Sequence, residues 1–370
     1  MKKNVVSKES VDSYEGWERQ ARASLDDERF RYITSSAGYG ETARANLEAF
    51  KRWRIVPRVL RDVGKRGTSI TLLGTKASAP LLLSPARGLG YVRRDGDRAV
   101  ARVAAELGVP LVVSTFATAS IEKTAQAMGG SPRWFQLYPG KDQEIMQSLV
   151  RRAETCGYSA IVVTVDKADS YPHHDGPREH EFDRCGYEVY FSDPVFRAKF
   201  GGSPEGRFEA AFRLWKEIRL APGLSLAGLD LITAQTKLPV IVKGVLNPKD
   251  AQLAAEHGAS GVVVSNHGGR SLDGELASLD ALVQVRSVVR QDFPVLLDGG
   301  VRSGTDILKA LALGADAVMI GKAYLLGLGA AGEEGVRKVL KGLMKEFEAA
   351  MGLCGALAVD EIDRSMVTEA

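Results

Sequence analysis

Short apolar runs recur along the chain, and helical patterns of apolar residues lie between them. The eight runs are residues 81–84 (LLLS), 110–114 (PLVVS), 134–137 (WFQL), 160–165 (AIVVTV), 240–243 (VIVK), 261–265 (GVVVS), 294–298 (PVLLD) and 317–320 (AVMI). Apolar residues recur at i, i+3 and i+4 within residues 99–107, 142–155, 248–257, 277–289 and 306–313. Continuous β-branched runs that alternate with helices are typical of a parallel sheet buried on both faces.

Eight such units indicate an α/β fold, a closed (β/α)8 TIM barrel over residues 76–330. A doubly wound open sheet is the alternative, but no predicted strand is followed by a G-x-G-x-x-G motif that opens a helix. We therefore predict one domain over residues 1–370. Its flanks are a helical segment at residues 1–75 and a C-terminal part, residues 331–370, with an amphipathic helix at 333–352 that packs on the outside.

The spacing of the runs is regular except in one place. Roughly 80 residues separate Ala160 in the fourth run from Val240 in the fifth. The excess, residues 167–230, lies on the side of the barrel where such enzymes place their sites. It is polar and contains His173, His174 and His180. We expect it to act as a lid over the site.

Composition narrows the class of protein. Of 370 residues, 45% are hydrophobic, which provides a large core and excludes disorder and a small disulfide scaffold. A net charge of +3 gives no reason to expect a nucleic-acid partner. No apolar run approaches the roughly 18 residues of a membrane span, and no signal peptide is recognisable. Cys156, Cys185 and Cys354 show neither metal spacing nor a disulfide framework, so we predict a cytoplasmic protein without a metal.

Polar residues concentrate where the predicted strands end, and in barrels that position is catalytic. His267 is the natural general base, since its pKa lies near working pH. Asp166 could orient the imidazole, and Arg270 offers a planar fork for a carboxylate. Taken singly, His267 could be structural and Asp166 a helix cap. The whole set at consecutive strand ends favours a functional site.

Two further groups extend this candidate site. Lys243 could hold negative charge on an electron sink, form a Schiff base or make an ordinary salt bridge. Gly299, Gly300 and Gly321 follow the last two strands, where barrels commonly bind phosphate through backbone amides. Arg302 and Lys322 would supply positive charge there.

These motifs resemble the FMN-dependent α-hydroxy acid oxidases and dehydrogenases, the glycolate oxidase-like family. The resemblance is carried by SNHGGRSLD, VIVKGV, TVD, WFQLY and LDGGVRSGTDILKALALGADAVMIGK, and it runs from around Tyr32 to Glu361. RWRIVPRVLRDV, SPRWFQLYPGKD and YFSDPVFR most resemble the lactate 2-monooxygenase branch.

The resemblance implies a role for each matching residue. It makes His267 the active-site base and Asp166 its partner, and it places Arg270 and Tyr32 at the substrate carboxylate. Tyr138 would touch the substrate hydroxyl, and Lys243 would contact N1 and O2 of the flavin. The other residues implied to contact FMN are Ser84, Pro85, Ala86, Ser114, Gln136, Thr164, Ser265, Asp298, Gly299, Gly300, Arg302, Gly321 and Lys322.

The sequence departs from the family pattern near the expected pocket. The family usually has an Arg in the stretch after TVD, whereas here His173 stands seven residues beyond Asp166 and the nearest Arg is Arg178. Arg87 occupies a position that is usually Ala or Gly, and it could replace the missing loop Arg as an anion anchor or turn away from the flavin. Phe116 stands where glycolate oxidase has Trp, and Lys322 stands where Arg is usual.

The implied reaction is oxidation of a 2-hydroxy acid at Cα, with two electrons passing to FMN and then to O2. Peroxide would either leave or decarboxylate a keto acid that the lid retains, which is the monooxygenase outcome. The alternatives are a flavin-free lyase that uses Lys243 as a Schiff base, a diverged flavin enzyme with a specialised non-lactate substrate, and a non-catalytic flavin-binding relative. The family also implies a homo-oligomer, a tetramer or an octamer.

Overall fold

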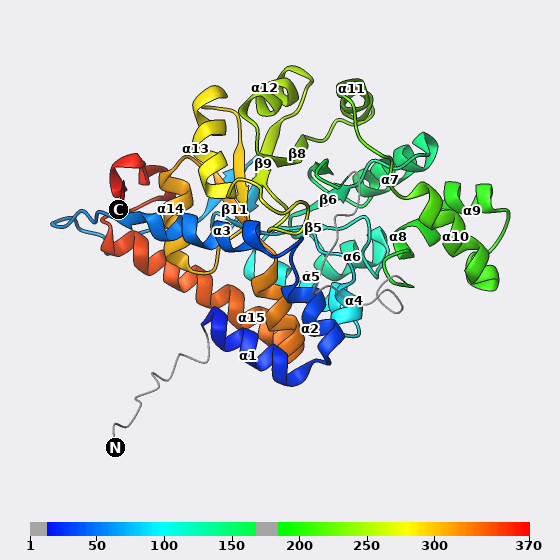
Figure 1. The fold of residues 1–370 in the computed structure, drawn as a ribbon, viewed down its shortest axis with the longest axis horizontal. Helices are drawn as coiled ribbons and strands as arrows, with labels where there is room; N and C mark the ends of the chain where they lie inside the picture. Colours follow the sequence, from blue (N-terminus) through cyan, green and yellow to red (C-terminus); the bar gives the residue numbers. More distant parts are fainter. Residues whose placement is uncertain (1–12, 168–183) are drawn as a thin grey trace.

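The computed structural model describes residues 13–167 and 184–370, and within them eight parallel strands close into a barrel (Figure 1). The strands, in order around the barrel, are β4 (Leu81–Leu83), β5 (Leu111–Val113), β6 (Arg133–Leu137), β7 (Ile161–Thr164), β8 (Val240–Val245), β9 (Gly261–Ser265), β10 (Val295–Asp298) and β11 (Ala317–Ile320). Each coincides with one of the eight apolar runs. The predicted (β/α)8 barrel is confirmed, and the open doubly wound sheet is excluded.

Helices cover the outside of the barrel. They are α4 (Leu89–Val92), α5 (Gly96–Leu107), α6 (Ile121–Met128), α7 (Gln143–Thr155), α11 (Leu226–Ala234), α12 (Pro248–Glu256), α13 (Ser278–Val288) and α14 (Gly304–Ala312). Local chemistry sets several of their boundaries. The Asp142 side chain accepts backbone N–H groups at the start of α7, and Ser303 and Asp306 form a capping box at the start of α14.

The N-terminal segment is helical only as far as Arg52. It contains α1 (Tyr14–Ser24), α2 (Asp27–Thr34) and α3 (Glu41–Arg52), followed by strands β1 (Trp53–Ile55), β2 (Ile70–Leu72) and β3 (Thr75–Ala77). Strand β1 pairs with the C-terminal strand β12 (Val367–Glu369), and β2–β3 is a hairpin. Leu72 of this hairpin joins the apolar interior of the barrel, and Thr75 accepts a hydrogen bond from the Trp134 indole at 2.8 Å. The helical segment predicted over residues 1–75 therefore ends at Arg52, because the residues beyond it pair as strands with one another and with the C-terminus.

The C-terminal helix begins earlier than its amphipathic pattern suggests. Helix α15 runs over Lys322–Leu353, with a break in its helical backbone at Ala331 and Gly332. The first half belongs to the last βα unit, and the second half buries Val336, Leu340 and Phe347. Two 3-10 turns, η3 (Val359–Glu361) and η4 (Arg364–Met366), follow before β12.

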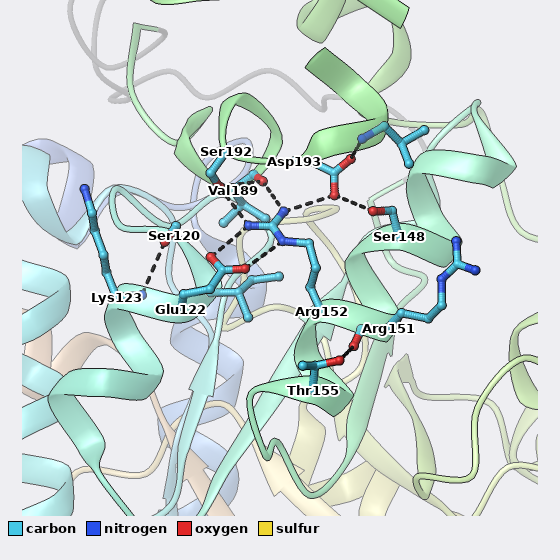
Figure 2. Close-up of polar contacts among 12 residues, drawn as sticks. Ser120, Glu122, Lys123, Ser148, Arg151, Arg152, Thr155, Val189, Ser192 and Asp193 are labelled. Atoms are coloured by element: carbon cyan, nitrogen blue, oxygen red, sulfur yellow. Dashed lines mark hydrogen bonds and ion pairs between the residues drawn. The ribbon is translucent and has the colours of Figure 1, made fainter. Parts of the chain in front are cut away.

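The described part of the insertion after β7 is a small helical unit. It contains α8 (Glu188–Phe191), α9 (Pro194–Phe200), η2 (Glu205–Arg207) and α10 (Phe208–Ile218), and it lies at one side of the barrel (Figure 1). Figure 2 shows how Arg152 of α7 joins it to the barrel. The Arg152 guanidinium contacts Glu122 of α6 and Asp193 of the insertion, and it donates to the Val189 carbonyl at 2.9 Å. His173, His174 and His180 lie outside the described residues.

The barrel interior is layered, because successive residues of a strand point to opposite faces of the sheet. Each strand contributes one inward-facing side chain to an apolar layer. These residues are Leu82, Val112, Trp134, Val162, Ile241, Val263, Leu296 and Met319. In every strand the next residue that faces inward comes two positions later, and it lies at the carboxyl end of the barrel. In all eight strands that position holds a polar residue or glycine. This alternation positions the site described next.

Candidate active site

The layer at the carboxyl end of the barrel consists of residues that the sequence assigned to a flavin. It comprises Ser84, Ser114, Gln136, Thr164, Lys243, Ser265, Asp298 and Gly321, each two residues beyond an apolar inward residue. All except Gly321 are buried. Pro85 and Ala86 follow directly after Ser84 and are half-buried. The fold thus gathers residues from widely separated strand ends around one barrel mouth.

A buried ion pair occupies part of this layer. Lys243 Nζ lies 2.8 Å from Asp298 Oδ2 and donates to Ser265 Oγ at 3.0 Å. The Ser84 hydroxyl donates to the other carboxylate oxygen of Asp298 at 2.8 Å. Burial would lower the pKa of Lys243, but Asp298 and Asp166 outweigh burial and raise it. The lysine therefore stays charged at the base of the site.

Two buried polar atoms on the neighbouring strands have no hydrogen-bond partner among the described residues. They are Nε2 of Gln136 and Oγ1 of Thr164. Gln136 is not loosely held, because its Oε1 accepts the Thr115 backbone N–H at 3.0 Å. A buried donor or acceptor without a partner costs free energy, so these atoms point to a polar ligand that satisfies them.

The glycines predicted to bind the phosphate lie at the ends of β10 and β11. Gly299 and Gly300 have φ values of +115° and +85°, a backbone that favours glycine. A Cβ on Gly300 would also come 2.7 Å from the Asn46 carbonyl oxygen, so tight packing adds to the requirement for glycine. Gly321 differs, since its φ of −119° is ordinary.

Two cations accompany these glycines. Burial, together with the positive charges of Arg270 and Arg302, lowers the pKa of Lys322 to about 7. The Arg302 guanidinium carbon lies 3.9 Å from the centre of the Tyr14 ring. Positive charge crowded in this way favours an anionic ligand such as phosphate.

His267 and Asp166 form a pair above the barrel mouth. His267 Nδ1 lies 2.9 Å from Asp166 Oδ1, so the Nδ1–H donates to the carboxylate and Nε2 is left to accept a proton. Burial lowers the pKa of His267, aided by Lys243 and Lys167 and only partly opposed by Asp166. Burial alone would raise the pKa of Asp166, but His267 and Lys243 hold it below its ordinary value. The imidazole is therefore neutral and able to act as a base near pH 7.

The backbone of the SNHGGR loop directs this imidazole. His267 itself has φ of +58°, and Gly268 and Gly269 continue the left-handed turn with φ of +66° and +76°. Such strain in a non-glycine residue is typical of functional sites. The Asn266 amide holds the turn through a reciprocal pair of hydrogen bonds with Asn46 of α3, at 2.9 and 2.8 Å.

Arg270, Tyr32 and Tyr138 lie near one another, as a carboxylate site requires. Arg270 Nη1 donates to the Tyr32 carbonyl at 2.7 Å, and its guanidinium carbon lies 5.2 Å from the centre of the Tyr32 ring. Burial raises the pKa of Tyr32 to about 12, partly opposed by Arg270 and Arg87. Burial and Asp166 also raise the pKa of Tyr138. Both phenols remain protonated, and the Tyr32 hydroxyl donates to the backbone carbonyl of Arg87.

Arg87 lies against an aromatic wall. Its guanidinium carbon is 5.9 Å from the ring centres of both Phe116 and Trp215, and Nη2 donates to the Cys185 carbonyl at 3.1 Å. Phe116 in turn stacks on Tyr138, with 5.0 Å between the ring centres. Arg87 therefore belongs to the side of the pocket that borders the insertion. His173 and Arg178, the other departures from the family pattern, lie outside the described residues.

Besides Asn46, four contributors to the site were missed by sequence reasoning. Thr115 holds both Gln136 and Tyr138, accepting the Tyr138 N–H at 3.0 Å. Lys167 donates to the Arg270 carbonyl at 2.8 Å, and Trp215 reaches the pocket wall from the insertion. Gly244 packs directly on Asp166. Only Gly244 gave a signal, because a glycine inside a strand indicates a bulge or a close approach.

FMN fits the residues present. The orphaned Gln136 and Thr164 atoms, with Lys243 beside them, match the polar edge of an isoalloxazine ring. Gly300, Arg302 and Lys322 match its phosphate. No group of three His, Cys, Asp or Glu residues in ranges 13–167 and 184–370 is placed to hold a metal ion.

Fold and site together define a flavin-dependent oxidoreductase built on a (β/α)8 barrel. A family model described as FMN-dependent dehydrogenase matches residues 21–369. The chain belongs to this family, and FMN is its cofactor. No helix in the described part of the chain is long and apolar enough to cross a membrane.

Relatives and solved structures agree with this assignment. The chain is 40% identical to an L-lactate oxidase of Lysinibacillus sphaericus (strain C3-41), over 90% of this chain and 86% of that protein. It is 37% identical to human 2-hydroxyacid oxidase 1, over 95% of each chain. A crystal structure of mandelate oxidase superposes with a TM-score of 0.85 and 34% identity, covering 98% of this chain and 99% of that one.

Proposed function

We propose that the protein oxidises a 2-hydroxy acid to the corresponding 2-keto acid, using FMN and then O2. The observation that carries the proposal is the His267–Asp166 pair, which shares one barrel mouth with the anion-binding group of Arg270, Tyr32 and Tyr138. A base beside a carboxylate site is what proton removal from a 2-hydroxy acid requires. The lactate, mandelate and 2-hydroxyacid oxidases named among the relatives support this substrate class.

Each residue has a distinct task in this proposal. Arg270 and Tyr32 bind the substrate carboxylate, and Tyr138 contacts the hydroxyl. His267 Nε2 removes a proton from the substrate, while Asp166 holds the ring and stabilises the imidazolium that forms. When bound, FMN accepts the two electrons. Lys243 supplies positive charge beside the flavin edge.

Arg87 sets the shape and charge of the far side of the pocket. We propose that it assists in anion binding from the wall formed with Phe116 and Trp215. Because a guanidinium occupies this wall, the pocket differs from one lined by a small residue, and this difference favours a substrate other than lactate. Bleaching of the bound flavin by a panel of 2-hydroxy acids that differ in size and charge tests this directly.

The fate of peroxide separates an oxidase from a decarboxylating monooxygenase. We propose the monooxygenase outcome if the insertion retains the keto acid until peroxide attacks it, as expected for the lactate 2-monooxygenase branch. Rapid product release would give the oxidase outcome. Measuring H2O2 and CO2 from the same turnover distinguishes the two.

A Schiff-base lyase is the less favoured alternative. It needs a neutral Lys243 amine as nucleophile. Asp298 lies 2.8 Å away and favours the charged ammonium. Borohydride trapping with a keto acid tests this alternative, and we expect no trapped adduct.

Assembly and location are also proposals. We propose a cytoplasmic homo-oligomer, a tetramer or an octamer. The absence of a disulfide among Cys156, Cys185 and Cys354 supports a reducing compartment. Light scattering coupled to size exclusion measures the oligomeric state.

The decisive experiment combines spectroscopy with a matched pair of variants. The purified protein should show a flavin spectrum that 2-hydroxy acids bleach without oxygen. His267→Ala should retain FMN and lose bleaching. His257→Ala is the control, because His257 forms a similar pair with Asp230 at 2.8 Å on the surface of the barrel. A colourless protein that FMN cannot reconstitute, or normal bleaching by His267→Ala, contradicts the proposal.

A further inference from the structure

Helix α1 lies against the phosphate end of the candidate site, although it is far from the barrel strands in sequence. It packs along α15, whose first residue is Lys322 (Figure 1). Tyr14, the first residue of α1, places its ring 3.9 Å from the guanidinium carbon of Arg302. Arg302 itself follows β10. The stack therefore joins the N-terminal helix to a cation at the barrel mouth.

A second residue of α1 faces the same cations. Glu18 is one helical turn beyond Tyr14 and so lies on the same face. Its negative charge opposes the lowering of the Lys322 pKa that burial, Arg270 and Arg302 produce. Tyr14 and Glu18 thus bring an aromatic face and a carboxylate to a place where positive charge accumulates.

A small cavity lies beside Arg302 and Tyr14. A cavity of about 30 Å³ is lined by Tyr14, Trp17, Arg302 and Glu346, among others. This volume suits one or two water molecules. Gly300 precedes Arg302 by two residues, and Arg302 is close enough to Lys322 to lower its pKa. A phosphate held by these three residues would therefore meet the guanidinium that the Tyr14 ring supports.

We infer that α1 forms part of the FMN site, in which Tyr14 holds Arg302 in place for the phosphate and Glu18 tunes the charge around it. This inference rests on the FMN placement proposed above. A stacked guanidinium keeps its N–H groups in one plane and free to donate at its edge. A phosphate dianion also compensates the charge of Arg302 and Lys322, which Glu18 alone balances only in part.

The test compares FMN with riboflavin, which lacks the phosphate. Apoprotein prepared from the full chain is titrated with each flavin, and the quenching of flavin fluorescence gives Kd. Tyr14→Leu should raise Kd for FMN about tenfold, in keeping with the loss of one cation–π contact. Its Kd for riboflavin should stay unchanged. Tyr14→Phe keeps the ring and should bind FMN nearly as wild type.

Two further variants separate the inference from a structural effect. Glu18→Gln removes the carboxylate and should tighten FMN binding without affecting riboflavin, even if Tyr14→Leu does not fold. Arg19→Gln, on the exposed side of α1, should change neither Kd. Equal FMN affinity in Tyr14→Leu and wild type, an unchanged FMN affinity in Glu18→Gln, or parallel weakening of both flavins overturns the inference. If wild-type protein binds no FMN, the proposed function fails instead.

Discussion

Gly244 lies directly against the carboxyl group of Asp166. A Cβ on Gly244 would come within 2.5 Å of Cγ of Asp166, much closer than such atoms pack. Gly244 has φ of +105° and falls where the register between β8 and β9 shifts, between Lys243 and Val245. One irregularity in β8 therefore leaves room for Asp166 while the preceding Lys243 points into the barrel.

Replacing Gly244 with alanine should displace Asp166 and misalign His267. We expect kcat/KM for the preferred hydroxy acid to fall on the order of 100-fold, as a misplacement of about 1 Å can cost. FMN absorbance should be retained. Steady-state kinetics and the flavin spectrum measure these two effects.

The control for this variant is Gly201→Ala. Gly201 also has a positive φ, +74°, but a Cβ at this position would meet no atom within 4 Å. The substitution therefore introduces the same kind of backbone strain without the steric contact. If Gly201→Ala and Gly244→Ala both keep near-normal activity, then the position of Asp166 does not depend on the missing Cβ of Gly244.

Lys167 should influence the pH dependence of the reaction. Burial lowers the pKa of His267, and the positive charges of Lys243 and Lys167 lower it further, while Asp166 opposes them. Lys167→Met removes one of these charges, so the pKa of His267 should rise. Because the base must be neutral, the acidic limb of kcat/KM should move to higher pH.

Lys167→Arg keeps the charge and serves as the comparison. Its acidic limb should coincide with that of wild type. If Lys167→Met lowers activity equally at every pH, then the 2.8 Å hydrogen bond to the Arg270 carbonyl is the important contribution, and the electrostatic explanation is wrong.

Much of the site could be predicted because barrel strands obey a period of two. Once the apolar runs are aligned, the residue two positions beyond each inward apolar residue must lie at the carboxyl end. Ser265 and Asp298 follow from Val263 and Leu296 in this way. His267, two residues past Ser265, continues the same count into the loop.

Other features depend on contacts between distant segments and leave little trace in the sequence. Nothing in the local pattern around Asn46 indicates its amide pair with Asn266, 220 residues away. Similarly, Trp215 reads as one apolar residue of an amphipathic helix. Only the folded insertion brings it to Phe116, with 5.7 Å between the ring centres.

The Lys243–Asp298 pair should be costly to break from one side. Asp298→Asn leaves the ammonium of Lys243 buried without its main counter-charge, and we expect a loss of about 3–5 kcal/mol in stability. Lys243→Met combined with Asp298→Asn removes both charges and should recover part of that loss. Urea unfolding of the apoproteins gives the free energies of unfolding. If Asp298→Asn alone has the same free energy of unfolding as wild type, the prediction that this ion pair is costly to break is wrong.

Arg152 should determine whether the insertion stays attached to the barrel. Its side chain is only 13% exposed, and Asp193 beneath it is fully buried. Asp193 also accepts the Ser148 hydroxyl at 2.7 Å (Figure 2). It accepts the backbone N–H groups of Val195 and Phe196 as well, at the start of α9. Removing the guanidinium leaves this carboxylate without its cation, at an expected cost of about 3–5 kcal/mol.

The prediction for Arg152→Met is therefore local opening of the insertion. Amide hydrogen exchange should accelerate in α8, α9 and α10 and remain slow in the β4 to β11 strands. Arg151→Met is the matched control, because Arg151 is the exposed neighbour on the same helix. Since Trp215 forms part of the pocket wall, KM should rise in Arg152→Met more than kcat falls. If amide exchange in α8, α9 and α10 is as slow in Arg152→Met as in Arg151→Met, then the aromatic contacts of the insertion hold it in place without Arg152.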